Sequence, residues 1–147
     1  MLLSLPVQSQ PQKYAPVRHL MLYLTEECNL RCTYCFVKKE PRFMTREIAL
    51  RTLDYVMQRN ISGGVYELFV TFFGGEPFLA VDRMQEVVDY AGQYRPNLDK
   101  VFRFAATTNG TLANARVERV IKDGALDLLV SLDGGVQANR LRPMVSG

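Results

Sequence analysis

The sequence has no long apolar run and no block of like charge. Its 147 residues include 18 Lys and Arg and 15 Asp and Glu, scattered along the chain, for a net charge of +3. No apolar segment approaches the roughly 20 residues that a membrane-spanning helix needs, and residues 1–16 lack the basic region and apolar core of a signal peptide. Scattered charge of this kind does not indicate a nucleic-acid partner. We therefore expect a soluble, cytoplasmic protein that binds neither a membrane nor nucleic acid.

Cysteine and histidine are also scarce. The chain has three cysteines, all within one short segment, and a single histidine, His19. An odd number of cysteines spaced so closely does not suit a set of disulfides that holds a fold together, and it fits a reducing compartment. The cysteines are better interpreted as metal ligands.

What the sequence does contain is the composition of one globular domain. Hydrophobic residues make up 48% of the chain and charged residues 22%, which allows a packed core. Short apolar runs, typical of buried strands, alternate with segments of helical periodicity. We expect strands over residues 18–24, 65–73, 101–107 and 126–132, and helices over residues 45–59, 81–94 and 113–122.

The order of these segments predicts the fold. A strand, a loop and a helix repeat three times before a fourth strand, and because crossovers between such strands are right-handed, the strands should be parallel. The fold class is therefore α/β, an open sheet or a partial (β/α) barrel, with its chemistry at the carboxyl ends of the strands. We expect the first strand to be buried on both faces, Thr45 to cap the first helix, and no helix after the fourth strand.

The three cysteines follow the first predicted strand in the segment TEECNLRCTYCF. The spacing Cys-x3-Cys-x2-Cys places Cys28, Cys32 and Cys35 on one compact loop that can direct three thiolates to one centre. A [4Fe–4S] cluster held by three cysteines keeps one iron without a protein ligand, and an open coordination position favours chemistry over a structural role. The alternatives are three unligated thiols or structural zinc, for which His19 is the only candidate fourth ligand but sits at the wrong end of its strand.

Polar turns also follow the three later strands. After the second strand, Gly74 and Gly75 allow close backbone approach, and Glu76 offers a carboxylate at the same edge of the sheet. The third strand ends in TTNGT and the fourth in SLDG, whose hydroxyl and carboxylate groups can bind a ribose or fix a substrate. Each of these segments alone is also an ordinary turn sequence. Their common position beside the cysteine segment favours a functional role.

The cysteine segment, with Tyr34 just before its last cysteine, resembles the radical S-adenosylmethionine (radical SAM) superfamily. The resemblance implies that Cys28, Cys32 and Cys35 hold a [4Fe–4S] cluster, and that the amino and carboxylate groups of S-adenosylmethionine chelate its free iron. It further implies that reduction of the cluster cleaves this cofactor to methionine and a 5′-deoxyadenosyl radical, which takes a hydrogen atom from the substrate.

The other turns extend the resemblance. GGEP is similar to the family's GGE motif, whose backbone and acid contact the ammonium group of the cofactor methionine. TTNGT and SLDG resemble the strand ends of the branch that contains anaerobic sulfatase maturases and SPASM-type peptide maturases, where the serine contacts the cofactor and the Asn and Asp lie close by. The cofactor-binding residues implied in this way are Tyr34, Gly74, Gly75, Glu76, Asn109, Ser131 and Asp133.

The resemblance covers residues 17–143 and implies a domain organisation. The family's barrel has six β/α units, of which this chain supplies about four. We therefore expect an N-terminal extension over residues 1–16 and a radical SAM core domain over residues 17–147 that is incomplete at its C-terminus. The segment QANRLRP departs from the HDxxRP pattern of the branch, since Ala138 and Asn139 replace the His-Asp pair. Arg140 or Arg142 could pair with a carboxylate of the cofactor or substrate, but we expect solvated arginines, which are commoner near a chain end.

The function implied is that of a radical SAM enzyme that modifies a peptide or protein side chain and receives electrons from a donor such as flavodoxin or ferredoxin. A second interpretation keeps the superfamily but changes the substrate to a small metabolite or cofactor precursor. A third is a non-catalytic module in which the metal only stabilises the fold, and it would need a fourth ligand from the protein.

Overall fold

The computed structural model describes residues 15–62, 65, 67–93 and 101–145. Most of the expected N-terminal extension, residues 1–14, thus lies outside the described residues. Four strands form one sheet in the order β1-β2-β3-β4, and every neighbouring pair is parallel. The strands are β1 (His19–Thr25), β2 (Glu67–Gly74), β3 (Val101–Thr108) and β4 (Asp127–Val130). The predicted α/β fold with parallel strands is confirmed.

Helices lie between the strands as the periodicity predicts. They are α1 (Arg46–Ser62), the short 3₁₀ helix η1 (Pro77–Ala80), α2 (Val81–Gly92) and α3 (Ala115–Gly124). The side chain of Thr45 accepts a hydrogen bond from the backbone N–H of Ile48 at 3.3 Å, as expected of an N-cap. Asn114 caps α3 in the same way, accepting from Arg116 and Val117.

One expectation about the end of the chain is wrong. A fourth helix, α4 (Val136–Asn139), follows β4, where we expected none. It is a single turn, closed by the backbone N–H of Asn139, which donates to the carbonyl of Gly135 at 3.1 Å. A turn of this length has no periodicity by which sequence could reveal it.

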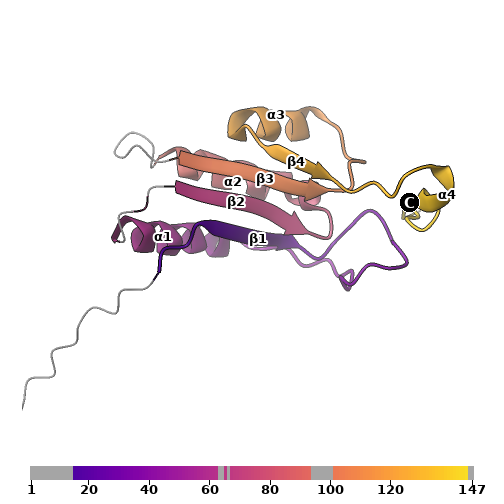
Figure 1. Cartoon of the computed structure of the whole chain (residues 1–147), viewed down its shortest axis with the longest axis horizontal. Coiled ribbons are helices and arrows are strands. Elements are labelled where there is room, and N and C mark those ends of the chain that lie inside the picture. The colour runs from indigo at the N-terminus through magenta and orange to yellow at the C-terminus, as the bar shows by residue number, and fades with distance from the viewer. Residues whose placement is uncertain (1–14, 63–64, 66, 94–100, 146–147) are drawn as a thin grey trace, which may run out of the picture.

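The core lies between the sheet and its helices. Figure 1 shows α1 and α2 behind the sheet. Leu22, Val70 and Phe104 of the strands are buried together with Leu53 of α1 and Met84 of α2. In the part of the chain that the structure describes, no second helical layer covers the opposite face, so Met21 is 54% exposed and every residue of β4 is exposed. The expectation that β1 is buried on both faces is therefore wrong.

The carboxyl ends of the parallel strands meet at one edge of the sheet. The long loop between β1 and α1 lies at this edge, as do α4 and the last described residues (Figure 1). The cysteine segment and the polar turns that follow the other strands therefore share one edge of the sheet. None of the described helices is long and apolar enough to cross a membrane.

Candidate functional site

The three cysteines lie on the loop between β1 and α1, residues 26–45, which we call the cysteine loop. Its two ends are joined at the sheet edge. The backbone N–H of Glu26 donates to the carbonyl of Arg42 at 3.0 Å, and that of Met44 donates to Leu24 at 2.7 Å. The hydroxyl of Thr25 adds a third bond to the Arg42 carbonyl at 2.8 Å. The loop thus leaves the sheet and returns to it at nearly the same place.

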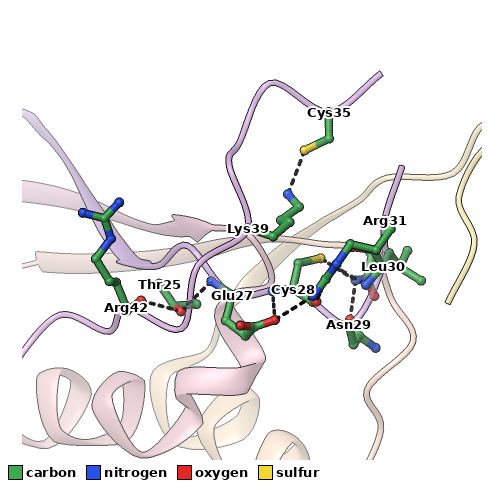
Figure 2. A network of polar contacts seen from close by, with 10 residues as sticks. Thr25, Glu27, Cys28, Asn29, Leu30, Arg31, Cys35, Lys39 and Arg42 are labelled. Carbon is green, nitrogen blue, oxygen red and sulfur yellow. Dashed lines mark hydrogen bonds and ion pairs between the residues drawn. The ribbon is translucent and has the colours of Figure 1, made fainter. Parts of the chain in front are cut away.

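All three thiols are free, and their surroundings differ. Cys28 is buried, and its Sγ accepts from the backbone N–H of Leu30 at 3.4 Å. Cys32 and Cys35 are half-buried. Figure 2 shows Cys28 and Cys35 on separate parts of the loop, with the ammonium group of Lys39 donating to the Cys35 Sγ at 2.8 Å.

Lys39 changes the acidity of Cys35. Burial alone would raise the pKa of this thiol, but hydrogen bonds from Lys39 and from the backbone of Val37, together with the positive charge of Lys39, outweigh it. The net pKa of Cys35 is lowered, which favours the thiolate, the form of cysteine that binds metals.

The glycine turn after β2 packs directly against the start of the cysteine loop. The backbone N–H of Gly75 donates to the carbonyl of Thr25 at 2.7 Å, and that of Glu76 donates to Glu27 at 2.9 Å. Gly74 has a φ of 145°, and a Cβ there would lie 2.2 Å from the carbonyl oxygen of Thr25. A Cβ on Gly75 would lie 2.2 Å from that of Glu27. Only glycine allows the two segments to approach so closely.

Glu76 differs from the expectation that it offers a carboxylate at the sheet edge. Its side chain is fully buried. One carboxylate oxygen accepts from the Thr108 hydroxyl at 2.9 Å and the other from the backbone N–H of Asn109 at 2.8 Å. Burial raises the pKa of Glu76, and these hydrogen bonds offset the rise only in part. Glu76 therefore fastens the glycine turn to the end of β3.

Asn109 reaches from the end of β3 to the cysteine loop. Its side-chain amide donates to the Oδ1 of Asn29 at 2.8 Å and lies 3.8 Å from the Sγ of Cys28. The carbonyl oxygen of the same side chain accepts from the backbone N–H of Thr111 at 2.9 Å, which fixes its orientation. The structure thus brings Asn109 next to the first cysteine.

The end of β4 approaches the other half of the loop. The hydroxyl of Tyr34 donates to the carboxylate of Asp133. This hydrogen bond is the main cause that raises the pKa of Tyr34 to about 12. Ser131 stays beside β3, since its backbone N–H donates to the carbonyl of Thr108 at 2.8 Å. The predicted cofactor residues therefore lie on the cysteine loop, in the case of Tyr34, or just after the ends of β2, β3 and β4.

Two residues of this edge were missed or misjudged from sequence. Arg142, expected to be solvated, has a side chain only 6% exposed because its segment folds back onto the cysteine loop. The contact between Lys39 and Cys35 was not predicted, although the two residues are only four positions apart in the sequence. Thr111 is a further contact of the loop, since its hydroxyl accepts from the side chain of Asn29 at 2.7 Å.

The donor set of three free cysteines on one loop fits a [4Fe–4S] cluster, in which each thiolate binds a different iron. Among the described residues, no group of three or more His, Cys, Asp or Glu side chains is placed to hold one metal ion. His19, the candidate fourth zinc ligand, instead shares a hydrogen bond of 2.8 Å with the Thr71 hydroxyl.

Comparisons with known proteins agree with this geometry. An uncharacterized protein of Methanocaldococcus jannaschii is 31% identical over 132 residues, which are 89% of this chain and 44% of the relative. A GTP 3′,8-cyclase of Synechocystis is 33% identical over 119 residues, 80% of this chain and 34% of the cyclase. The solved structure of native anSMEcpe with bound AdoMet and Cp18Cys peptide superposes with a TM-score of 0.72 at 25% identity, over 88% of this chain and 35% of that one.

A parallel α/β sheet with three free cysteines at the carboxyl ends of its strands fits the class of proteins that bind an iron–sulfur cluster through cysteine thiolates. The sequence profile of the Radical SAM superfamily matches residues 22–145, and the chain belongs to that superfamily. The family implies a [4Fe–4S] cluster, and similar solved structures contain bound AdoMet. The chain spans less than half the length of these relatives.

Proposed function

We propose that this chain forms the cluster-bearing part of an enzyme that cleaves S-adenosylmethionine and uses the resulting 5′-deoxyadenosyl radical to modify a peptide or protein side chain. The observation that carries the proposal is the bonding of the glycine turn to the base of the cysteine loop. Because the backbone N–H groups of residues 75–76 donate to the carbonyls of Thr25 and Glu27, the two segments that would hold the cluster and the cofactor form one unit.

In this proposal Cys28, Cys32 and Cys35 hold the cluster. When bound, the cluster supplies the electron that breaks a carbon–sulfur bond of S-adenosylmethionine. The acidic Cys35 thiol favours ligation, since metals bind the thiolate. The buried Cys28 would keep part of the cluster away from water.

The cofactor would lie over the strand ends beside this loop. We assign it to Tyr34, Gly74, Gly75, Glu76, Asn109, Ser131 and Asp133. Glu76 acts in this assignment through its backbone carbonyl, because its carboxylate is occupied by Thr108 and Asn109 and its backbone N–H donates to Glu27. The side chain of Asn109, held by Thr111 and next to Cys28, is placed to orient a ligand between the two motifs.

A peptide or protein substrate is the finer part of the proposal. Its support is the similarity to anSMEcpe, whose solved structure contains a bound peptide as well as AdoMet. The other candidate substrate is a small metabolite, supported by the 33% identity to a GTP 3′,8-cyclase. Either reaction requires a one-electron donor, for which we propose a flavodoxin or a ferredoxin.

The first test is anaerobic iron–sulfur reconstitution, followed by electron paramagnetic resonance of the dithionite-reduced protein with and without S-adenosylmethionine. We expect a [4Fe–4S]⁺ signal that changes when the cofactor is added, because the cofactor would occupy the free iron. Cys28→Ala, Cys32→Ala and Cys35→Ala should each abolish the signal. Lys38→Ala, a change of an exposed side chain on the same loop, should leave it intact.

Tight zinc binding without an iron–sulfur signal would overturn the proposal and favour a structural metal module. A test of the substrate class requires the full-length protein. Formation of 5′-deoxyadenosine that is accelerated by cysteine-containing peptides but not by GTP would support the peptide assignment. The reverse dependence would favour the metabolite.

A further inference from the structure

The last described residues pair with the cysteine loop although about a hundred residues separate them. The backbone N–H of Arg31 donates to the carbonyl of Pro143 at 2.8 Å, and that of Thr33 donates to Leu141 at 2.9 Å. The backbone N–H of Val145 returns a bond to Asn29 at 3.0 Å. Leu30 and Met144 form an antiparallel bridge within this pairing. We call residues 141–145 the clamp segment.

Arg142 anchors the clamp segment to the end of β4. Its side chain is 6% exposed, and its Nη1 donates to the carbonyl of Ser131 at 2.5 Å. The same nitrogen lies 3.9 Å from the carboxylate of Asp133. The Nε of the same guanidinium is buried without a hydrogen-bond partner among the described residues, so the Ser131 carbonyl and the Asp133 carboxylate compensate only part of its desolvation cost. The contacts of Nη1 hold the clamp segment beside the end of β4.

Asp133 connects this anchor back to the cysteine loop. Its carboxylate accepts from the hydroxyl of Tyr34, and Tyr34 lies between the second and third cysteines. The bonds from Arg31 and Thr33 flank Cys32 on both sides. The loop is consequently held around the second cysteine by backbone pairing and, beside the third, by the chain Tyr34–Asp133–Arg142.

The cysteine loop has no helix and no named strand of its own between β1 and α1. A segment without internal regular structure loses conformational entropy when a metal site orders it, and contacts that order it beforehand reduce that cost. We propose that Arg142 is a positioning residue which, with the clamp segment, holds the cysteine loop in its cluster-binding arrangement. This inference rests on the proposed function, because it assumes that the loop binds a cluster. The backbone pairing between the clamp segment and the cysteine loop is present in the protein without a cluster.

The test uses three substitutions in the whole chain and two controls. Arg142→Ala removes the anchor, and Arg142→Lys keeps a positive charge and one donor. Val145→Pro removes the N–H that donates to Asn29, and Val145→Ala is its control because it retains that N–H. Arg140→Ala is the control for charge, two residues from Arg142.

The effect of each substitution is measured in two ways, by the rate of cluster removal and by amide hydrogen exchange. In the reconstituted protein, the rate at which an iron chelator removes the cluster should rise about tenfold for Arg142→Ala and Val145→Pro, as expected for the loss of one or two hydrogen bonds. Arg142→Lys should restore most of the lifetime, and both controls should match the parent. In the protein without a cluster, amide hydrogen exchange at Arg31 and Thr33 should accelerate in Arg142→Ala while the amides of β2 keep their protection.

Unchanged cluster lifetime and unchanged exchange at Arg31 and Thr33 in both Arg142→Ala and Val145→Pro would overturn the inference. The exchange measurement needs no cluster. A parent protein that binds no iron–sulfur cluster would therefore contradict the proposed function, while the exchange rates would still decide whether the clamp segment orders the loop.

Discussion

The carboxylate of Glu76 accepts a hydrogen bond from the hydroxyl of Thr108 at 2.9 Å, in a place from which water is excluded. Glu76 ends the glycine turn after β2, and Thr108 is the last residue of β3. A residue that sequence marks as a cofactor contact is thus also a buried connection between two neighbouring strand ends. Its substitution should affect folding as well as function.

We expect Glu76→Gln to lower the free energy of unfolding at pH 7 by about 1–3 kcal/mol, because the amide nitrogen cannot accept the hydrogen bond that the backbone of Asn109 or the hydroxyl of Thr108 now donates. Urea unfolding followed by circular dichroism measures this. Glu47→Gln, at an exposed position on α1, should change the free energy far less. Equal effects of the two substitutions would contradict the role of Glu76 as a connection.

The same residue predicts a pH dependence. Because burial raises the pKa of Glu76 above its unfolded value near 4, folding favours its protonated form. This proton-linked part of its contribution is fully present below the unfolded pKa and is lost as the pH rises through the folded pKa, while the hydrogen bonds that its carboxylate accepts remain at pH 7. The stability advantage of the parent over Glu76→Gln should therefore be larger at acid pH than at neutral pH. A difference that stays constant from acid to neutral pH would show that the pKa of Glu76 is not raised.

Adding a methyl group to the glycine turn should separate it from the cysteine loop. Gly75→Ala places a Cβ 2.2 Å from the carbonyl oxygen of Glu27, so backbone atoms must move. We expect a loss of about 1–3 kcal/mol in the free energy of unfolding, together with a smaller amount of bound cluster after reconstitution. Gly92→Ala, at a position where no atom lies within 4 Å of the added Cβ, is the control and should show neither effect.

Lys39 should control the reactivity of Cys35 in the protein without a cluster. Lys39→Met removes a hydrogen bond and a charge that lower the pKa of this thiol, so the pKa should rise. The pH profile of alkylation, measured with Cys28 and Cys32 replaced by Ser, reports it. Lys38→Met should leave the profile unchanged, because the Lys38 ammonium pairs with Glu40 and is 85% exposed. Identical pH profiles of alkylation for Lys39→Met and Lys38→Met would show that Lys39 does not contact Cys35.

The bond between Tyr34 and Asp133 can be tested by titration. The pKa of Tyr34 is raised to about 12, chiefly by its hydrogen bond to Asp133. Asp133→Asn removes the negative charge beside the phenol, and the pKa should return toward its usual value of about 10. Ultraviolet titration of tyrosinate, with Tyr34→Phe to identify the component, gives the result. Asp127→Asn, at the opposite end of β4, should have no effect on this component.

The sequence alone was sufficient for the strand and helix order. Apolar runs of strand length alternate with amphipathic helical segments, and these local patterns placed the four strands, α1, α2 and α3 within a few residues of their observed bounds, while η1 and α4 were not predicted. The spacing of Cys28, Cys32 and Cys35 and the GGEP turn also identified the correct superfamily, because ligands close together in sequence form a local signal.

The features that could not be predicted from the sequence depend on contacts between different segments of the chain. The burial of Glu76, the exposed face of β1 and the position of Arg142 beside Ser131 follow from how strand ends and the last residues pack together. The sequence by itself determined the elements, their parallel order and the cysteine motif, since each is written in neighbouring residues. Only the tertiary structure decided which polar side chains at the sheet edge face water and which hold the cysteine loop. Burial and hydrogen-bond partners come from other segments of the chain, 32 positions away for Glu76 and Thr108 and about a hundred for Arg31 and Pro143.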